Sequence, residues 1–458
     1  MLKDNHKLYE QLKTDYPFFV YEGFTISDSK DKLHVTYHFN LADKFSFHPE
    51  LEFYKNGLSD NNLSTEVVNN FVFHIGLVEL ISYWKVACPP QIIIKPFNLT
   101  QEQIDWWKYL WFNGLGEFFY TNNIQVNLME YVQLTCLGND HPTPAFIQAD
   151  SKKVLVPVGG GKDSAVTLEL LKIHFECTPF AVNPRGAIME TIEAAGFTTD
   201  RMISVKRSIH HELLRLNDLG FLNGHTPFSA LIAFVSAFVA ALCGIRSIAL
   251  SNESSANEPT DIVTGVNHQY SKSFEFESDF RQYLKAHVTP DINYFSFLRP
   301  LNEYTIAGLF ANMPAYFPVF KSCNAGSKTD TWCGKCPKCL FTFIILSPHL
   351  SKKKVVEIFG KDLLDDKSLL EFFKELAGIA EIKPFECVGT VDEVNYALTR
   401  TIERRGEILP ELLRFYISTP FFHRYKDFQK EEITQMEQND HFLEDKFLIV
   451  LKKALHVK

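Results

Sequence analysis

The segment whose residue types most directly suggest chemistry is Gly159-Gly160-Gly161-Lys162-Asp163-Ser164. It follows a short apolar run, Val154-Leu155-Val156-Pro157-Val158, and precedes a helical pattern from Ser164 to about Phe175. Glycines allow a tight turn that brings backbone N–H groups close to an anion, and a helix start adds N–H donors and a positive dipole end. The pattern predicts a phosphate-binding loop between a strand and a helix.

Three side chains in this loop favour a nucleotide with a bound cation. Lys162 supplies a positive charge, and Ser164 supplies a hydroxyl at the helix start. Asp163 would repel a bare phosphate, so its presence is best explained if it holds Mg²⁺. A Walker A loop is excluded, because Asp163 follows Lys162 and Val156 stands at the first glycine position. A dinucleotide fingerprint is excluded because Ser164 replaces its third glycine.

Four cysteines form a second chemical cluster, with the spacing Cys323-x9-Cys333-x2-Cys336-x2-Cys339. Four thiolates suit tetrahedral zinc, and a closed set of four ligands leaves no open position for chemistry. An iron–sulfur cluster uses the same ligands, so it stays open as an alternative. The nine cysteines of the chain are an odd number, and five of them are isolated, which favours a metal site in a reducing compartment, the cytoplasm.

Both clusters lie in a stretch where strand patterns alternate with helix patterns. This rhythm predicts a parallel sheet with covered faces, and such sheets bind ligands at the carboxyl ends of their strands. The uncharged segment 226–245 has the length of a membrane span, but Pro227 and Gly244 suit the ends of a helix and a strand follows at once. We therefore expect a buried helix. The expected strands after the loop are 178–182, 200–205 and 247–250, with a helix near 187–195.

The chain is predicted to form three domains: a mixed α+β domain at 1–148, an α/β domain with the loop and the cysteines at 149–345, and a mostly helical domain at 346–458. The patterns behind the outer two domains are a strand at 33–39, another at 51–54, helices at 67–84, 101–120, 352–359, 366–377, 393–405 and 410–416, and an amphipathic tail at 431–456.

The charge and composition of the chain limit the kinds of partner that the protein is expected to bind. The formal net charge is −9 and no block of Lys and Arg is present, so we expect no nucleic-acid partner. The first residues have no apolar stretch of the secretory kind, and no membrane partner is expected. The oligomeric state is not indicated by the sequence. The 41 phenylalanines predict a Phe-rich core rather than a stacking surface.

The loop resembles the Ser-Gly-Gly-x-Asp-Ser loop of the PP-loop ATP pyrophosphatases, with Gly159 in place of the first serine. Those enzymes have a parallel, adenine nucleotide alpha hydrolase-like sheet, and they transfer AMP from ATP to a carboxylate or amide oxygen. The resemblance implies ATP and Mg²⁺ as cofactors. It also implies that four residues at strand ends border the nucleotide, namely Asn183, Ser251, Asn252 and Glu253. The cysteine spacing resembles that of 7-cyano-7-deazaguanine synthase, which has a structural zinc.

Five longer strings are similar to the UDP-N-acetyl-α-D-muramoyl-L-alanyl-L-glutamate epimerases, and the similarity runs from about residue 80 to 420. This resemblance implies an enzyme of cell wall biogenesis and cell shape that inverts the terminal L-glutamate of a peptidoglycan precursor to D-glutamate. ATP and Mg²⁺ would drive the reaction through an acyl-adenylate, with release of AMP and pyrophosphate. The strings are Leu222–Pro227, Ser251–Ala256, Val266–Ser273, Tyr294–Leu301 and Pro384–Gly389.

These strings do not identify the residues that would move the proton. His225 follows a glycine at a predicted helix start, where a neutral imidazole base is favoured. His268, Lys272 and Cys387 are the other candidates, and each is as well suited to a structural role. Three further residues are candidates for binding the substrate: Arg207, Tyr270 and Arg299, with the arginines suited to bidentate contacts with carboxylate or diphosphate.

Two other functions remain open at this point. Another PP-loop adenylating enzyme, such as an amidoligase similar to 7-cyano-7-deazaguanine synthase, would share the loop and the cysteines but would add nitrogen to its substrate. A non-catalytic nucleotide sensor would keep the fold. Intact Lys162, Asp163 and Ser164 argue against the sensor, since it has no need for a pyrophosphate-release loop.

Overall fold

The computed structural model describes residues 4–55, 63–258, 266–323, 325–326, 329–406, 408–428, 436 and 440–456. Contacts between residues divide the chain into two compact units. The first unit comprises Met1–Leu155, Met202–Ile248 and Tyr270–Tyr294, and the second comprises Val156–Arg201, Ala249–Gln269 and Phe295–Lys458. Each unit therefore combines segments that are distant in the sequence.

The strands are hydrogen-bonded in the order β11-β10-β7-β8-β9-β4-β2-β1-β5-β6, with β3 paired to β2. The pairs β7–β10, β1–β5 and β5–β6 are parallel, whereas β2 is antiparallel to β1, β3 and β4, and β4 is antiparallel to β9. The sheet is thus mixed. The strand bounds are β1 Phe18–Asp28, β2 Lys32–Leu41, β3 Phe45–Phe47, β4 Glu50–Tyr54, β5 Gln91–Ile94, β6 Gln133–Cys136, β7 Asp150–Pro157, β8 Glu176–Val182, β9 Ile203–Ser208, β10 Ile245–Leu250 and β11 Asn293–Ser296.

Alternation of side chains along β2 orients the sheet of the first unit, as the sequence predicts. Its odd-numbered residues from 33 to 41 are buried, while the even-numbered ones are half-buried. Tyr37 on the buried face donates a hydrogen bond to the carbonyl of Val72 in helix α2 (3.1 Å). Phe238 of helix α9 packs against Phe53 of β4 and Phe71 of α2, with ring centroids 5.0 and 5.3 Å apart. The Phe-rich core predicted from composition is present here.

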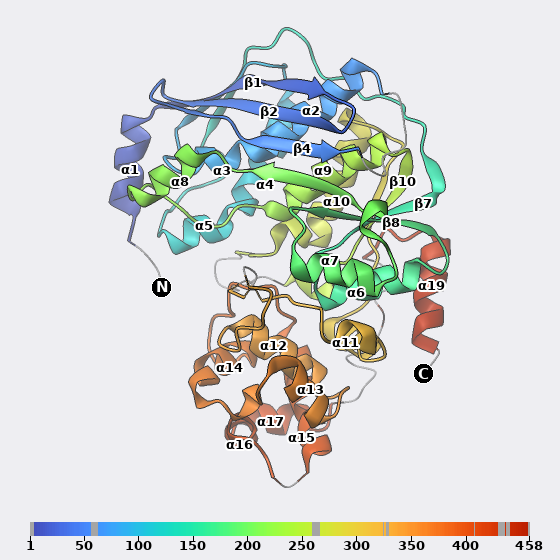
Figure 1. Ribbon diagram of the computed structural model, residues 1–458. Helices are drawn as coiled ribbons and strands as arrows, with labels where there is room; N and C mark the ends of the chain where they lie inside the picture. The colour runs from blue at the N-terminus through green and yellow to red at the C-terminus, as the bar shows by residue number, and fades with distance from the viewer. Residues whose placement is uncertain are drawn as a thin grey trace. The chain divides into compact units, whose positions relative to one another are not determined.

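Figure 1 shows β1, β2 and β4 side by side, with β9 next to β4. The described helices of the first unit are α1 His6–Asp15, α2 Thr65–Glu79, α3 Ile81–Trp84, α4 Gln101–Gly114, α5 Gly116–Thr121, α8 His211–Asp218, α9 Phe228–Leu242 and α10 Phe274–His287.

The uncharged segment that contains α9 is a buried helix, as predicted. Only the stretch Thr65–Trp84, among the described residues, is a helix long and apolar enough to cross a membrane, and 83% of its most apolar window is buried inside the protein. The predicted helix start at residue 101 is also confirmed: the Thr100 hydroxyl and the Gln103 side chain form a reciprocal capping box at the start of α4.

The second unit contains the helices that flank the glycine loop and the predicted C-terminal helices (Figure 1). Helix α13 has the predicted bounds, and α15 begins two residues earlier than predicted. The described helices of this unit are α6 Lys162–Leu171, α7 Gly186–Ala194, α11 Glu303–Phe310, α12 Pro337–Leu346, α13 Lys352–Phe359, α14 Leu370–Leu376, α15 Val391–Arg405, α16 Glu411–Ile417, α17 Pro420–Tyr425 and α19 Asp445–His456.

One local prediction needs correction, and one can be checked only in part. Asp200 and Arg201 were expected in a strand, but they lie in a 3₁₀ turn, Thr199–Arg201, and β9 begins only at Ile203. The backbone N–H of Arg201 donates to the carbonyl of Thr198 (2.9 Å), which closes the turn. The amphipathic tail is helical at Asp445–His456, whereas 429–435 and 437–439 lie outside the described residues.

Candidate nucleotide and metal sites

The glycine loop joins β7 to α6 in a conformation that suits an anion. Gly160 has a φ of +78°, a left-handed value that favours glycine, and a Cβ there would come within 3.0 Å of the backbone of Ala187 and Ile188. Gly161 is the N-cap of α6, and no described side chain caps this helix. The N–H groups of its first turn are therefore left for an anion.

Lys162, the first residue of α6, is buried between two carboxylates. Its ammonium forms ion pairs with Asp163 and with Glu303, and only 5% of the Lys162 and Glu303 side chains is exposed. Burial alone lowers the pKa of Lys162, but Asp163 and Glu303 more than offset this and hold it above its ordinary value. Lys162 is thus a fixed cation next to the loop.

Glu303 links the loop to two further acids. Burial raises the pKa of Glu303 well above its ordinary value; Lys162 opposes this shift, whereas Asp163, Glu253 and Glu393 add to it. The backbone N–H of Glu303 donates to the carboxylate of Glu393, whose other oxygen accepts from the N–H of Thr390. The Lys162 ammonium therefore contacts two carboxylates, and the acids Glu253 and Glu393 lie near the second of these, Glu303.

The segment after β10 carries the predicted nucleotide residues in this unit. The amide of Asn252 donates to the hydroxyl of Ser296 (3.0 Å), and Arg299 donates to the carbonyl of Glu253 (2.7 Å) and to Ser296 (3.3 Å). Arg299 is fully buried, so these contacts fix the backbone of the segment. The hydroxyl of Ser251 is buried without a hydrogen-bond partner among the described residues, which leaves it for a ligand.

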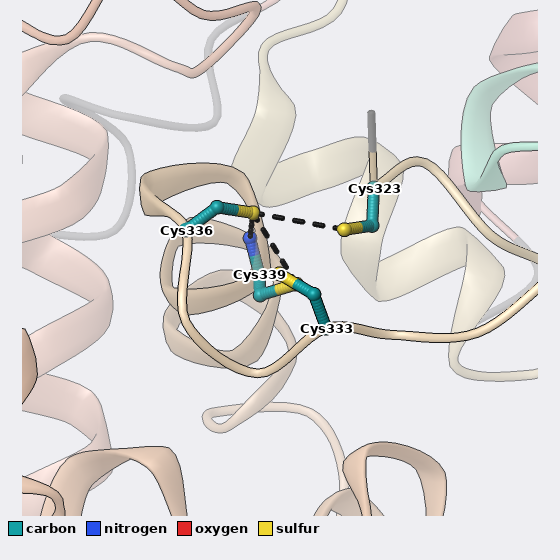
Figure 2. Close-up of side chains that lie close together, drawn as sticks. All are labelled: Cys323, Cys333, Cys336 and Cys339. Atoms are coloured by element: carbon teal, nitrogen blue, oxygen red, sulfur yellow. Dashed lines mark hydrogen bonds between the residues drawn. The ribbon is translucent and has the colours of Figure 1, made fainter. Parts of the chain in front are cut away.

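Figure 2 shows that the four cysteines converge on one point. Their sulfur atoms lie within 4.8 Å of one another, with separations of 3.7 Å for Cys323–Cys336, 3.7 Å for Cys333–Cys339 and 3.5 Å for Cys336–Cys339. Backbone N–H groups of Gly326 and Lys335 point at sulfur (3.2 and 3.4 Å). The side-chain hydrogen bond between Cys336 and Cys339 is the largest cause that lowers the pKa of Cys336, to about 5. In their deprotonated, thiolate form the four cysteine sulfur atoms can bind a metal ion.

The cysteine segment holds the glycine loop directly. The N–H of Lys321 donates to the carbonyl of Gly160 (2.8 Å). Asp330, between the first two cysteines, accepts a hydrogen bond from the N–H of Ala187 (3.1 Å) at the start of α7. A Cβ at Gly186 would lie 2.0 Å from the Asp330 carboxylate, so glycine is required for this approach. Since α7 packs against Gly160, the cluster supports the loop from two sides.

His225 lies in the first unit, paired with an acid. Its Nδ1 is 3.4 Å from the carboxylate of Glu117, which is the arrangement of an imidazole oriented by a carboxylate. The ammonium of Lys85 donates to the carbonyl of Gly224, next to His225. Burial, with Arg207 as a second cause, lowers the pKa of Lys85 to about 8. Lys85 and Glu117 are titratable neighbours that the sequence did not reveal.

His268 and Cys387 lie in the second unit, and the structure brings their segments together. The imidazole of His268 is 6.4 Å from the ring of Phe385 in an edge-to-face contact. Burial raises the pKa of Glu386, while the charges of Lys338 and His268 oppose this. The segment at Pro384–Gly389 thus contacts the predicted catalytic histidine.

Three of the remaining predicted residues lie in the first unit, and Asn183 lies in the second. Arg207 makes a bidentate ion pair with the buried Glu79 (2.9 and 2.9 Å), which fixes the guanidinium. Tyr270 is buried, and Lys272 ends the 3₁₀ turn that Tyr270 begins. Asn183 follows β8 with a φ of +50°. Roles of these residues in ligand binding stay predictions.

Glu303 and Glu393 could not be predicted as site residues from the sequence. They lie 141 and 231 residues beyond Lys162 (303 − 162 and 393 − 162) and belong to no motif. A weak signal was available for Glu393, which stands three residues after Thr390 as in a capping box. No local pattern marks Glu303.

Together these features define an α/β protein with a glycine loop at a helix start that suits an anion and four cysteines that could hold a metal ion. Comparison with known proteins identifies the family. The family model described as MurL N-terminal domain matches residues 10–297, and the model described as MurL C-terminal domain matches residues 319–412. No solved structure matches the chain.

Three relatives carry the name UDP-N-acetyl-alpha-D-muramoyl-L-alanyl-L-glutamate epimerase. Those of Micromonospora sp. and Salinispora tropica are each 36% identical to the chain, over 71% of it and 73% and 72% of their own lengths. That of Xanthomonas oryzae pv. oryzae is 34% identical over 70% of the chain and 72% of its own length. The chain belongs to this epimerase family, and it is an isomerase.

Removing the buried cation should destabilise the protein. In Lys162→Met the carboxylates of Asp163 and Glu303 lose their ammonium partner, so the free energy of unfolding should fall by about 3–5 kcal/mol at neutral pH. Because the pKa of Glu303 is raised in the fold, this loss should shrink as the pH falls and the Glu303 carboxyl takes up a proton. Chemical denaturation at several pH values measures this.

The control is Lys354→Met, which breaks an exposed pair with Glu357 and should leave the denaturation midpoint nearly unchanged. Equal effects of the two substitutions, or a loss for Lys162→Met that grows at low pH, would contradict the buried cation model.

Weakening the cysteine cluster should loosen the glycine loop. In Cys333→Ser, amide hydrogen exchange at 159–164 should quicken, and turnover should fall by about 100-fold, the cost of a catalytic group displaced by about 1 Å. Cys136→Ser, which changes a thiol in β6 outside the cluster, is the control and should change neither quantity. Unchanged exchange at 159–164 in Cys333→Ser would show that the cluster does not support the loop.

Proposed function

We propose that the protein uses ATP and Mg²⁺ to invert the terminal L-glutamate of UDP-N-acetylmuramoyl-L-alanyl-L-glutamate to D-glutamate, in the cytoplasm, for peptidoglycan synthesis. The substrate follows from the names of its relatives. The structural observation that carries the proposal is the uncapped start of α6, where Lys162 is paired with the carboxylates of Asp163 and Glu303.

Charge supports ATP with Mg²⁺ as the ligand of this loop. Lys162 is already paired with Asp163 and Glu303, and two further acids, Glu253 and Glu393, lie close enough to Glu303 to raise its pKa. A triphosphate alone would be repelled by these acids, whereas carboxylate and phosphate oxygens together are the ligands Mg²⁺ prefers. Mg²⁺ would neutralise the charge that develops on the departing pyrophosphate. Asp163, 30% exposed, and Glu303 are the residues that would hold it.

Activation of the carboxylate explains why an epimerase would use ATP. The α-proton of a free glutamyl carboxylate is hard to remove, because a doubly charged enediolate would form. Attack of that carboxylate on the α-phosphate forms a mixed anhydride with AMP, releases pyrophosphate and cancels the charge. A base then takes the α-proton, and delivery of a proton to the opposite face inverts the carbon. Hydrolysis of the anhydride restores the carboxylate and releases AMP.

The residues divide into two groups in this proposal. The loop N–H groups, Lys162 and Ser164 bind phosphate oxygens, while Ser251 and Asn252 bind the nucleotide at the end of β10. His225 takes or gives the α-proton. The support for His225 is the Glu117 carboxylate 3.4 Å away, which would orient the ring and stabilise its charged form.

Zinc is the metal we propose for the four cysteines. Four thiolates bound at about 2.3 Å in a tetrahedron lie about 3.8 Å apart, close to the sulfur separations of 3.5 to 3.7 Å. A [4Fe–4S] cluster, in contrast, binds each thiolate to a different iron and needs a wider set of ligands. The site is closed, so its role is to hold the segment that supports Gly160 and α7.

The products test the proposal. Incubation with the UDP-linked muramoyl dipeptide, ATP and Mg²⁺ should yield AMP, pyrophosphate and D-glutamate, measured by chiral analysis after hydrolysis. Asp163→Asn should yield neither AMP nor D-glutamate, since the proposed Mg²⁺ ligand is gone. The matched control Asp200→Asn changes an exposed acid of the same unit and should keep full activity.

Two outcomes would contradict this function. ADP as the sole nucleotide product would exclude adenylation. A mass increase from added nitrogen, with L-glutamate retained, would show the amidoligase chemistry instead.

Proton transfer by His225 is tested separately. Turnover in D₂O should place deuterium on the glutamate α-carbon. His225→Gln should slow inversion by about 10²–10⁴-fold, the usual contribution of a positioned base, while ATP–pyrophosphate exchange continues. His174→Gln, at an exposed histidine of the second unit, is the control. Loss of exchange together with inversion in His225→Gln would assign this residue to another role.

A further inference from the structure

Three histidines of the first unit lie in one row across three neighbouring strands. The register pairs Phe39 with Phe47 and Thr36 with Glu50, so His38 on β2 stands opposite His48, between β3 and β4. Glu50 is paired with Ser208 of β9, and the same register continues to place His48 opposite His210. Directly opposite residues in antiparallel strands have Cβ atoms about 4.5–5.5 Å apart, within reach of a shared ligand.

The side chains agree with the register. The Nδ1 atoms of His38 and His48 are 3.0 Å apart, and the rings of His48 and His210 are 5.5 Å apart and nearly perpendicular. The Nδ1 atom of His210 is buried and has no hydrogen-bond partner among the described residues. His48 is exposed and His38 is half-buried, so the row is open to ions from solvent.

The surroundings favour neutral imidazoles with an acid nearby. Burial lowers the pKa of His38, and His48 adds to the shift. Burial also lowers the pKa of His210; His211 and His48 add to this, whereas Glu212 and Glu50 oppose it. A neutral imidazole is the form that binds a metal ion, and nearby carboxylates favour a cation.

We propose that His38, His48 and His210 bind a divalent transition metal ion such as Zn²⁺, at a site distinct from the four cysteines. Two imidazole nitrogens on one tetrahedral zinc, each at about 2.0–2.1 Å, lie about 3.3 Å apart, close to the separation of His38 and His48. Rotation of the His210 side chain would supply the third ligand. Three histidines leave the fourth position open to water, as in a reactive zinc site rather than a closed one.

A simple hydrogen bond between His38 and His48 is the competing explanation of their short separation. One neutral imidazole would then donate from Nδ1 to the other. That explanation does not account for the third imidazole at the next position of the row, or for the buried nitrogen of His210. The metal site accounts for all three residues.

Metal titration of the full-length protein tests the proposal independently of the epimerase reaction. The cysteine cluster is first filled with one equivalent of Zn²⁺. Titration with Co²⁺ at neutral pH should then show one further equivalent, with the visible bands of nitrogen ligation. His48→Ala and His210→Ala should each weaken this binding by more than tenfold, since even loss of a ligand's supporting partner costs about 10–100-fold. His174→Ala, at an exposed histidine of the second unit, should bind like the wild type.

Because His48 is exposed, its substitution should leave the thermal midpoint and circular dichroism unchanged, which separates loss of metal from loss of fold. Three results would overturn the proposal: no further equivalent in the wild type, equal binding by the wild type and both histidine variants, or cobalt bands showing thiolate ligation only.

Discussion

The packing of the second unit depends on the ion pairs that the buried ammonium of Lys162 forms. It binds the acid beside it in the loop and an acid at the start of α11, and Glu393 of α15 contacts the backbone of that second acid. One charge therefore joins the loop, α11 and the helical C-terminal region. Such a cluster is costly to bury unless its charges are balanced, so the arrangement is stable only while the cation is held in place.

Much of the fold follows from local patterns. The alternation along β2, the glycine loop between β7 and α6 and the apolar helix α9 were all predicted, because each depends on neighbours within one element. The parallel pair β7–β10 was implied by the strand–helix rhythm. The mixed sheet was not predicted, since β1, β5 and β6 pair through contacts between distant segments that no short pattern records.

The residues of the candidate sites also differ in whether a local pattern or a contact between distant segments places them. The four cysteines could be predicted because all the possible ligands of this metal site lie within one short segment, at Cys323, Cys333, Cys336 and Cys339. Glu303 was not predicted, because only tertiary packing brings it into its ion pair with Lys162. The histidine row was not predicted for another reason. His38, His48 and His210 come together only through the pairing register of the strands, and a register shift of one residue would turn each side chain to the other face of the sheet.

The acids around Lys162 bear on the adenylation proposed above. A site built only to hold a triphosphate would surround it with cations, whereas here the buried ammonium of Lys162 is already paired with Asp163 and Glu303. In the proposed reaction Mg²⁺ would therefore make much of the contact with the nucleotide, and pyrophosphate would leave together with that cation. The AMP part carries less charge, and polar groups such as the Ser251 hydroxyl, which is buried without a hydrogen-bond partner among the described residues, would hold it. This arrangement would favour release of pyrophosphate while the activated carboxylate is retained, which is the order that the proposed inversion of the neighbouring carbon requires.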